Sequence, residues 1–308
     1  MKTTVVICSA HRPDVLAETI ESVLCRQSVP PLEIIVSVFN QTHVTAETGR
    51  RPGVRVVLSG IQGTCAQRNA AARVVQTPYT LFLDDDVELA ANFIESMERL
   101  LDHDTDAVAA TGFLVIDGAR GDGGLDRSVA RSYASNYVRE HENYDHGEGQ
   151  NIFVRSQVFE KVLFDENLPL YGWLEDLDFA TNILRYGRII MNTETCWAHI
   201  GTPGGRTTGL RFGYSQVVNP LYLWRKNGKP GLTRVIFGHW LRYLAYNYRR
   251  ELIKHPTDRS DRSGRFTGNM IALRHVLVGK VDPTYILQVS RQPETRYTGH
   301  GRPRISDV

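Results

Sequence analysis

The sequence predicts an α/β fold with a mostly parallel central sheet and helices on both of its faces. In the first hundred residues, short apolar segments alternate with segments of helical spacing, an order typical of βαβ units. Three acidic residues, Asp84 to Asp86, directly follow one of these apolar segments. Because ligands bind at the carboxyl ends of strands in such sheets, we expect the functional site there.

Short apolar segments mark the expected strands, and periodic apolar positions mark the expected helices. The strands are expected at Thr3–Ser9, Glu33–Val38, Val54–Leu58, Tyr79–Leu83, Ala107–Ile116, Ile152–Arg155 and Arg188–Met191. The helices are expected at Pro13–Cys25, Cys65–Val75, Ser156–Val162 and Leu174–Tyr186, and near residues 216–226, 232–254 and 266–279. Asp14 is expected to cap the first helix, and Gly187 to follow the helix that ends at Tyr186. Residues 117–149 lack periodicity and predict a mobile loop.

The composition is that of an ordinary globular protein, since 42% of the 308 residues are hydrophobic and 23% are charged. The cysteines, Cys8, Cys25, Cys65 and Cys196, form no CxxC pair, which argues against a zinc cluster and a disulfide framework. The apolar run after Met1 is too short for a signal peptide. No apolar stretch reaches the roughly 18 residues that a membrane-spanning helix needs. We therefore expect a cytoplasmic protein with reduced thiols, which at most lies on the inner face of a membrane.

The net charge of +2 hides an uneven distribution of charge along the chain. Residues 204–308 contain 19 basic and 6 acidic side chains, whereas residues 1–203 contain 17 basic and 28 acidic ones. The C-terminal part is therefore expected to face something anionic. Nucleic acid, anionic lipid and a phosphate-bearing substrate all fit this charge.

Aromatic side chains lie among the basic ones in the C-terminal third: Tyr222, Trp224, Arg225, Lys226, Phe237, Trp240, Arg242, Tyr243, Tyr246, Tyr248, Arg249 and Arg250. This mixture is favoured at membrane interfaces and predicts peripheral attachment to anionic lipid. Helices that pack an aromatic face on the rest of the chain, or on a second subunit of a homo-oligomer, would show the same pattern. No nucleic-acid-binding motif is present in the sequence, so nucleic acid is not an expected partner.

The three adjacent carboxylates after Leu83 indicate a metal site. Such carboxylates repel one another, and their burial needs a compensating positive charge. Magnesium and manganese prefer oxygen ligands and can also bridge two phosphates of a nucleotide. The alternative is an acidic turn that is simply solvated.

Two further positions can carry chemistry. Glu175 and Asp176 stand at the start of a predicted helix, where the helix dipole favours acids in any case. The apolar neighbours Trp173 and Leu174 would partly desolvate a carboxylate there and raise its pKa toward that of a general base. His199 follows a predicted strand and is either structural or the partner of Asp86 on a metal.

In this order and spacing, the motifs resemble those of family-2 glycosyltransferases, which have the GT-A fold. The matching segments are Arg12-Pro13, Gly63 with Gln67-Arg68-Asn69-Ala70, Phe82-Leu83-Asp84-Asp85-Asp86 as the DxD motif, Gly149–Arg155, and Gly172-Trp173-Leu174-Glu175-Asp176 as the ED motif. The resemblance covers roughly residues 3–210, and a weaker likeness reaches residues 279–283. It implies a catalytic domain over residues 1–213, with a nucleotide-binding half to about residue 116, and a helical extension over 214–308.

The resemblance also implies roles for single residues. Asp86 and His199 would bind Mn²⁺ or Mg²⁺, and Asp176 would be the catalytic base, with Glu175 orienting acceptor hydroxyls. The residues expected to bind the nucleotide-sugar are Arg12, Arg68, Asp84 and Asp85; Asp84 would hold the ribose or order Arg68. Arg206 and Arg211 are added from charge and position alone, as candidates for gripping the diphosphate.

The implied activity is that of an inverting, metal-dependent hexosyl- or deoxyhexosyltransferase of polysaccharide biosynthesis. It would move a sugar from a nucleotide-diphospho-sugar to a hydroxyl of a saccharide or of a lipid-linked acceptor. One departure from the family pattern concerns the nucleotide base. The second predicted strand ends in Phe39-Asn40, where family members commonly carry an aspartate pair that reads uracil. Thymidine and guanosine donors therefore stay open, with Phe39 able to stack on a base and Asn40 able to bond to one.

Three other readings fit parts of the sequence. A sugar-phosphate nucleotidyltransferase shares the sheet and the acidic site, but it usually has a glycine-rich basic loop where this chain has Ser9 to Pro13. A glycosidase also uses paired carboxylates, but it does not need the acidic triplet. A non-catalytic nucleotide-sugar-binding or scaffold protein would not need to keep Asp84, Asp86, Asp176 and His199 together.

Overall fold

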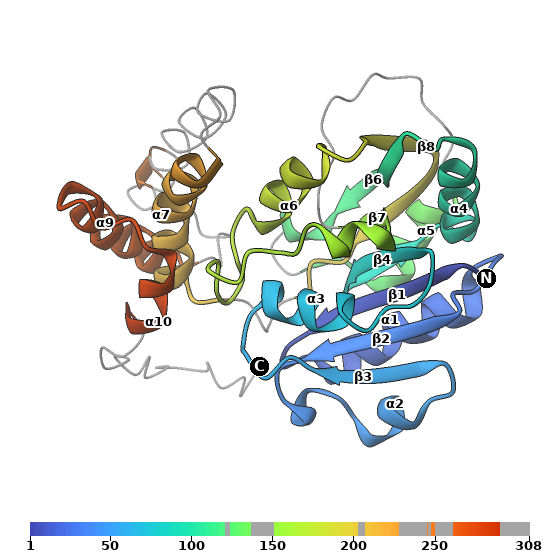
Figure 1. Ribbon diagram of the computed structural model, residues 1–308. Coiled ribbons are helices and arrows are strands. Elements are labelled where there is room, and N and C mark those ends of the chain that lie inside the picture. Colours follow the sequence, from blue (N-terminus) through green and yellow to red (C-terminus); the bar gives the residue numbers. More distant parts are fainter. Residues whose placement is uncertain are drawn as a thin grey trace, which may run out of the picture.

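A computed structural model describes residues 1–120, 124–136, 151–202, 207–227, 245, 248–249 and 261–289. One central sheet with flanking helices forms most of the molecule (Figure 1), and α7, α9 and α10 gather beside it on the side of α6. The predicted α/β fold with a C-terminal helical extension is confirmed. Of the predicted C-terminal helices, the one at 232–254 lies almost wholly outside the described residues.

The sheet has eight strands in the order β3-β2-β1-β4-β7-β6-β8-β5. Their bounds are β1 Thr3–Ser9, β2 Glu33–Val38, β3 Val54–Leu58, β4 Tyr79–Asp84, β5 Val87–Leu89, β6 Ala107–Asp117, β7 Ile152–Arg155 and β8 Arg188–His199. The first half, β3 to β4, is entirely parallel. In the second half β6 and β8 are parallel, whereas the pairs β4–β7, β6–β7 and β5–β8 are antiparallel.

Two hydrophobic cores cover the two faces of this sheet. Strands that are buried on both faces read as continuous apolar runs, as in β1, where neighbouring side chains enter different cores. Val5 and Ile7 belong to the core that contains side chains of α1 (Pro13–Arg26) and α4 (Phe93–His103). Val6 belongs to the core beneath α3 (Thr64–Ala72) and α6 (Glu175–Ile183). The carboxyl ends of β1 and β4 are therefore held rigidly between two packed layers.

The helices differ from the sequence prediction in two details. Arg12, and not Asp14, is the N-cap of α1, because Pro13 with its fixed φ occupies the first turn. The expected loop at 117–149 contains ordered structure, namely η2 (Gly118–Arg120) and α5 (Arg127–Ser135); residues 121–123 and 137–150 lie outside the described residues. The short elements are α2 Ala46–Arg50 and the 3-10 helices η1 Gln41–His43, η3 Ser156–Glu160 and η4 Pro283–Tyr285.

The C-terminal helices pack closely against one another. α7 (Gly209–Asn227) and α9 (Arg262–Leu277) enclose a small core of their own together with α10 (Ile286–Val289). A Cβ atom on Gly213 would lie 2.0 Å from the carbonyl oxygen of Arg265, so only glycine permits this approach. Ion pairs from Lys226 to Asp165 and Asp178, 2.7 Å each, tie the end of α7 to the sheet domain.

Part of the basic and aromatic set on this extension is therefore used for packing. Tyr222 donates a hydrogen bond to Asp165, whereas Trp224 stays exposed. No helix in the described ranges is both long and apolar enough to cross a bilayer.

Candidate active site

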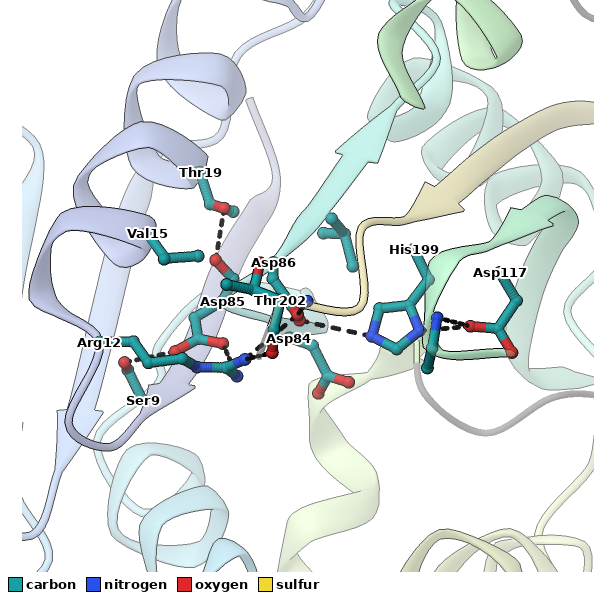
Figure 2. A network of polar contacts seen from close by, with 12 residues as sticks. Ser9, Arg12, Val15, Thr19, Asp84, Asp85, Asp86, Asp117, His199 and Thr202 are labelled. Atoms are coloured by element: carbon teal, nitrogen blue, oxygen red, sulfur yellow. Dashed lines mark hydrogen bonds and ion pairs between the residues drawn. The ribbon is translucent and has the colours of Figure 1, made fainter. Parts of the chain in front are cut away.

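The site lies where the carboxyl ends of β4, β6 and β8 meet (Figure 2). β8 inserts between β6 and β5, so the register places His199 opposite Asp117 on one side and opposite Val87 on the other. Asp84 ends β4, and Asp86 follows in the turn to β5. Figure 2 shows the His199 ring between Asp117 and the acidic residues Asp84 and Asp86.

Asp84, Asp86 and His199 form a set that can hold a metal ion. One ligand atom of each lies within 4.8 Å of the others. Nε2 of His199 is 3.4 Å from Oδ1 of Asp86, and Nδ1 is 2.8 Å from Oδ1 of Asp117. When Nδ1–H donates to Asp117, the lone pair of Nε2 faces the carboxylates, which is the arrangement of a histidine metal ligand with a supporting carboxylate.

The electrostatics of His199 also fit a cation site. Burial of the ring disfavours its charged form, but hydrogen bonds with Asp117 and Asp86, and the nearby carboxylates, outweigh this and raise the pKa of His199 to about 10. Without a metal, a proton on Nε2 therefore supplies the positive charge between the carboxylates. Two carboxylate oxygens and an imidazole nitrogen form a donor set that suits a divalent metal ion.

Arg68 connects Asp84 of the candidate metal site to Glu175 of the ED motif. Nη1 of Arg68 is 2.5 Å from Oε1 of Glu175, and Nη2 is 3.7 Å from Oδ1 of Asp84. The Arg68 guanidinium also lies over the rings of Phe82 and Phe164, 5.8 and 5.1 Å from their centroids. The predicted pairing of Asp84 with Arg68 is present, and Glu175 is a partner that the sequence did not reveal.

The two acids of the ED motif have different surroundings. Burial raises the pKa of Glu175 to about 8, although Arg68 opposes the shift. Its Oε2 atom is buried and has no hydrogen-bond partner within the described part of the chain. Asp176 is only partly buried, and its Oδ1 accepts the N–H of Leu177 at 2.8 Å. Asp176 follows Glu175 in the first turn of α6, and its charge contributes to the raised pKa values of Glu175 and Arg68.

The profile of the family described as Glycosyl transferase family 2 matches residues 4–163, more than half of the chain. The chain belongs to this family. No curated protein sequence matches it.

Solved glycosyltransferase structures share the fold of this family-2 glycosyltransferase. S. aureus TarS 1-349 is 16% identical, with a TM-score of 0.50 over 78% of this chain and 71% of that chain. GalNAc-T7 with UDP, GalNAc and Mn²⁺ is 15% identical, with a TM-score of 0.52 over 94% of this chain and 56% of that chain. The mannosyltransferase PcManGT from Pyrobaculum calidifontis, in complex with GDP-Man and Mn²⁺, is 14% identical, with a TM-score of 0.52 over 94% and 79%. The predicted GT-A fold is thereby confirmed.

In this glycosyltransferase Asp85 and Arg12 support the acidic turn. Asp85 is 1% exposed, and its carboxylate accepts hydrogen bonds from Ser9 Oγ at 2.5 Å and from Arg12. Burial raises the pKa of Asp85 to about 6 despite the opposing charge of Arg12. Arg12 also donates to Oδ2 of Asp86 at 3.2 Å, and that oxygen accepts the N–H of Thr202 at 2.7 Å. Asp85 thus points toward Ser9 and Arg12, whereas Asp84 and Asp86 lie on the side of His199 (Figure 2).

Of the two arginines expected to bind the diphosphate, the structure describes only Arg211. Arg206 lies outside the described residues. Arg211 stands in the first turn of α7, and its buried Nε atom has no hydrogen-bond partner among the residues that the structure describes. No ion pair joins Arg211 to the acidic turn in the described part of the chain.

The expected base-binding position, directly after β2, is occupied by Phe39 and Asn40, and two histidines lie in contact nearby. Phe39 is exposed, and the side-chain oxygen of Asn40 accepts the N–H of Thr42 at 3.0 Å, which caps η1. The ring of buried His43 lies 4.2 Å from that of His11. His11 and His43 were not predicted, since neither lies in a recognisable motif.

Two more residues of the site were missed from the sequence. Asp117 directly follows an expected strand, the same signal that marked Asp84 to Asp86, and could have been found by it. Asn151 precedes β7 and lies beside the end of β4, because Ile152 pairs with Phe82. Both polar atoms of the fully buried Asn151 amide lack hydrogen-bond partners among the described residues.

Proposed function

We propose that this glycosyltransferase moves a sugar from a nucleotide-diphospho-sugar to an acceptor hydroxyl in one in-line displacement, which inverts the anomeric carbon. The observation that carries the proposal is the convergence of Asp84, Asp86 and His199 within 4.8 Å, next to the Arg68–Glu175 pair. PcManGT is in complex with GDP-Man and Mn²⁺, and GalNAc-T7 with UDP, GalNAc and Mn²⁺.

Asp86 and His199, with Asp84 beside them, would hold a divalent ion. Such an ion, when bound, neutralises the diphosphate as negative charge develops on the leaving group. Asp117 orients His199 through Nδ1, and Arg12 holds Asp86 in place. These residues fix the ligand atoms before the ion arrives, which is the main contribution of a protein to such a site.

Asp176 is the proposed base that takes the proton of the acceptor hydroxyl. It is partly buried beside Glu175, which Arg68 holds in position. A positioned base typically contributes about 10²–10⁴-fold to the rate. Arg211, and Arg206 from the sequence alone, are the proposed contacts of the diphosphate. The nucleotide base would lie near Phe39 and the His11–His43 pair, where the described residues carry no aspartate pair for uracil.

The deciding experiment measures nucleoside-diphosphate release from a panel of UDP-, dTDP- and GDP-sugars, with Mn²⁺ and with excess chelator. Release should depend on the metal, and Asp176→Asn should lower transfer by at least about 10²-fold while donor binding is retained. Asp126→Asn, which changes an exposed acid outside the site, is the matched control. Transfer that persists in chelator, or in Asp176→Asn, would contradict the proposal. Pyrophosphate formation from a nucleoside triphosphate would favour the nucleotidyltransferase reading, and binding without turnover the scaffold reading.

We also propose that the extension binds anionic lipid and brings the enzyme to a lipid-linked acceptor. Support comes from the basic C-terminal third and from the end of α9, where Leu277 and Val278 are 84% and 69% exposed near Arg274 and Lys280. Exposed apolar groups beside cations suit an anionic interface. The protein should float with anionic vesicles and not with neutral ones, and Leu277→Asp should reduce the bound fraction. Absence of flotation with anionic vesicles would favour a role of the extension in packing alone.

A further inference from the structure

An arginine of α5 connects strand β5 with helix α1 close to the acidic turn. Arg127 stands in the first turn of α5, and only 14% of its side chain is exposed. Its Nη1 atom donates to Oε1 of Glu88 in β5 at 2.8 Å, and its Nε atom donates to Oε2 of Glu18 in α1 at 2.9 Å. The Nη2 atom donates to the hydroxyl of Thr19, also in α1, at 2.9 Å. One planar group therefore joins three elements that are far apart in the sequence.

The Thr19 hydroxyl extends this contact to the backbone of the acidic turn. Thr19 is fully buried, and its hydroxyl donates to the carbonyl oxygen of Asp85 at 2.6 Å (Figure 2). A hydroxyl has a single proton to donate, and a threonine in a helix often donates it to the carbonyl four positions earlier. Here that carbonyl, of Val15, accepts Nη2 of Arg127 at 3.4 Å. Arg127 therefore competes for this acceptor, and by donating to Thr19 it directs the hydroxyl proton toward Asp85.

The hydrogen bond to the Asp85 carbonyl fixes the backbone that carries Asp86. A peptide unit is planar, so this carbonyl oxygen and the Cα atom of Asp86 belong to one rigid group. The following peptide unit is held as well, because the N–H of Ile200 donates to the carbonyl oxygen of Asp86 at 2.9 Å. The orientation of these two peptide units sets where the Asp86 carboxylate stands relative to His199. The Thr19 hydroxyl is thus one of two contacts that fix this backbone.

Neutralising the charge of Glu88 does not require this arrangement. Glu88 is 1% exposed, and its carboxylate also accepts a hydrogen bond from Ser22 Oγ at 2.7 Å and pairs with Arg131 at 3.2 Å. Arg131 therefore supplies a second cation to the same carboxylate from the same helix. Within the described part of the chain, only Arg127 joins Glu88 to Thr19. The planar fork of a guanidinium can reach both groups at once, whereas the compact ammonium group of a lysine cannot.

We propose that Arg127 is a positioning residue of the metal site and acts through the Thr19 hydroxyl on the peptide unit before Asp86. The inference rests on the proposed function, in which Asp86 binds the divalent ion. A ligand whose backbone is already held loses less conformational freedom when the ion binds. Loss of a partner that orients a metal ligand typically costs about 10–100-fold in metal affinity. Because Arg127 acts through a second residue, we expect a loss at the lower end of this range.

The test measures Mn²⁺ binding to the full-length protein, without nucleotide, by electron paramagnetic resonance. Arg127→Lys keeps a positive charge beside Glu88 but loses the fork, and should weaken Mn²⁺ binding about tenfold. Arg131→Lys is the matched control, since it makes the same change on the same helix beside the same carboxylate, and should leave the affinity unchanged. Thr19→Val removes the hydroxyl at nearly constant volume and should also weaken binding about tenfold, whereas Thr19→Ser should keep it.

The double variant of Arg127→Lys and Thr19→Val should bind Mn²⁺ about as well as the weaker single variant, because both changes break the same chain of hydrogen bonds. The inference is wrong if either single variant binds Mn²⁺ as tightly as the unmodified protein, or if Arg131→Lys or Thr19→Ser is weakened equally. Stability in urea is measured on the same samples, and Mn²⁺ affinities that merely follow stability across the variants would also contradict it. Absence of Mn²⁺ binding by the unmodified protein would refute the metal site of the proposed function, and the inference with it.

Discussion

Asp117→Ala tests whether His199 is a metal ligand whose orientation is set by the hydrogen bond from its Nδ1 atom to Asp117. Asp117 is mostly buried, lies 2.8 Å from Nδ1 of His199, and is itself held by the N–H of Ala119 at 3.0 Å. Removing the carboxylate frees the ring to rotate and to place its proton on Nε2, where the metal should bind. Loss of such a supporting carboxylate typically costs about 10–100-fold in metal affinity.

Two variants separate the contributions of the charge and of the hydrogen bond of Asp117 to metal affinity. Asp117→Asn keeps an oxygen that can accept from Nδ1–H and loses only the charge, so we expect about a tenfold loss, or about 1.4 kcal/mol. Asp117→Ala loses the hydrogen bond as well and should approach about 100-fold, or about 2.7 kcal/mol. Mn²⁺ binding is measured by calorimetry and by electron paramagnetic resonance, with Asp126→Asn as the control for a lost surface charge. Unchanged Mn²⁺ affinity in Asp117→Ala would show that His199 does not bind the metal in this way.

Three further predictions concern stability. At pH 9, where Glu175 is ionised, Arg68→Met leaves this buried carboxylate without its cation and should lower the free energy of unfolding by about 3–5 kcal/mol in urea titrations; a loss below about 1 kcal/mol would mean that the pair is not buried in solution. Gly213→Ala should lower the free energy of unfolding by at least about 1–3 kcal/mol, because its Cβ has no room. Gly49→Ala, whose Cβ would lie 3.8 Å from its nearest neighbour, should not, and equal losses in the two variants would contradict the close approach of α7 and α9. The folded protein raises the pKa of His199 from its ordinary value of 6.5 to about 10. Protonated His199 therefore stabilises the fold fully below pH 6.5, and this stabilisation is lost as the pH rises through about 10. In excess chelator the free energy of unfolding should therefore fall across that range, and an identical slope in His199→Gln would contradict this assignment.

Much of the fold could be read from local patterns. Strands that are buried on both faces are continuous apolar runs, so β1, β2 and β7 begin and end where the sequence predicted. The edge strand β3 is only partly buried, but its valines still mark its bounds correctly. α5 was missed although Ala130 and Ala134 stand at helical spacing, because the helix has only nine residues and lies in a stretch rich in Gly, Asp and Arg. β8 was expected to stop at Met191 but continues to His199, because its second part pairs with β5 and β6.

The sequence by itself determined which residue types stand at the carboxyl ends of strands, since an acid that follows an apolar run marks such an end. Tertiary structure alone decided their pairing. Arg68 and Glu175 are 107 positions apart, and His199 meets Asp117 across 82 positions. Within the acidic triplet, only the packed structure turns Asp85 toward Ser9 and Arg12 and brings Asp84 and Asp86 together with His199. These choices depend on strand order and on the cost of burying an unpaired charge, which no local stretch of sequence contains.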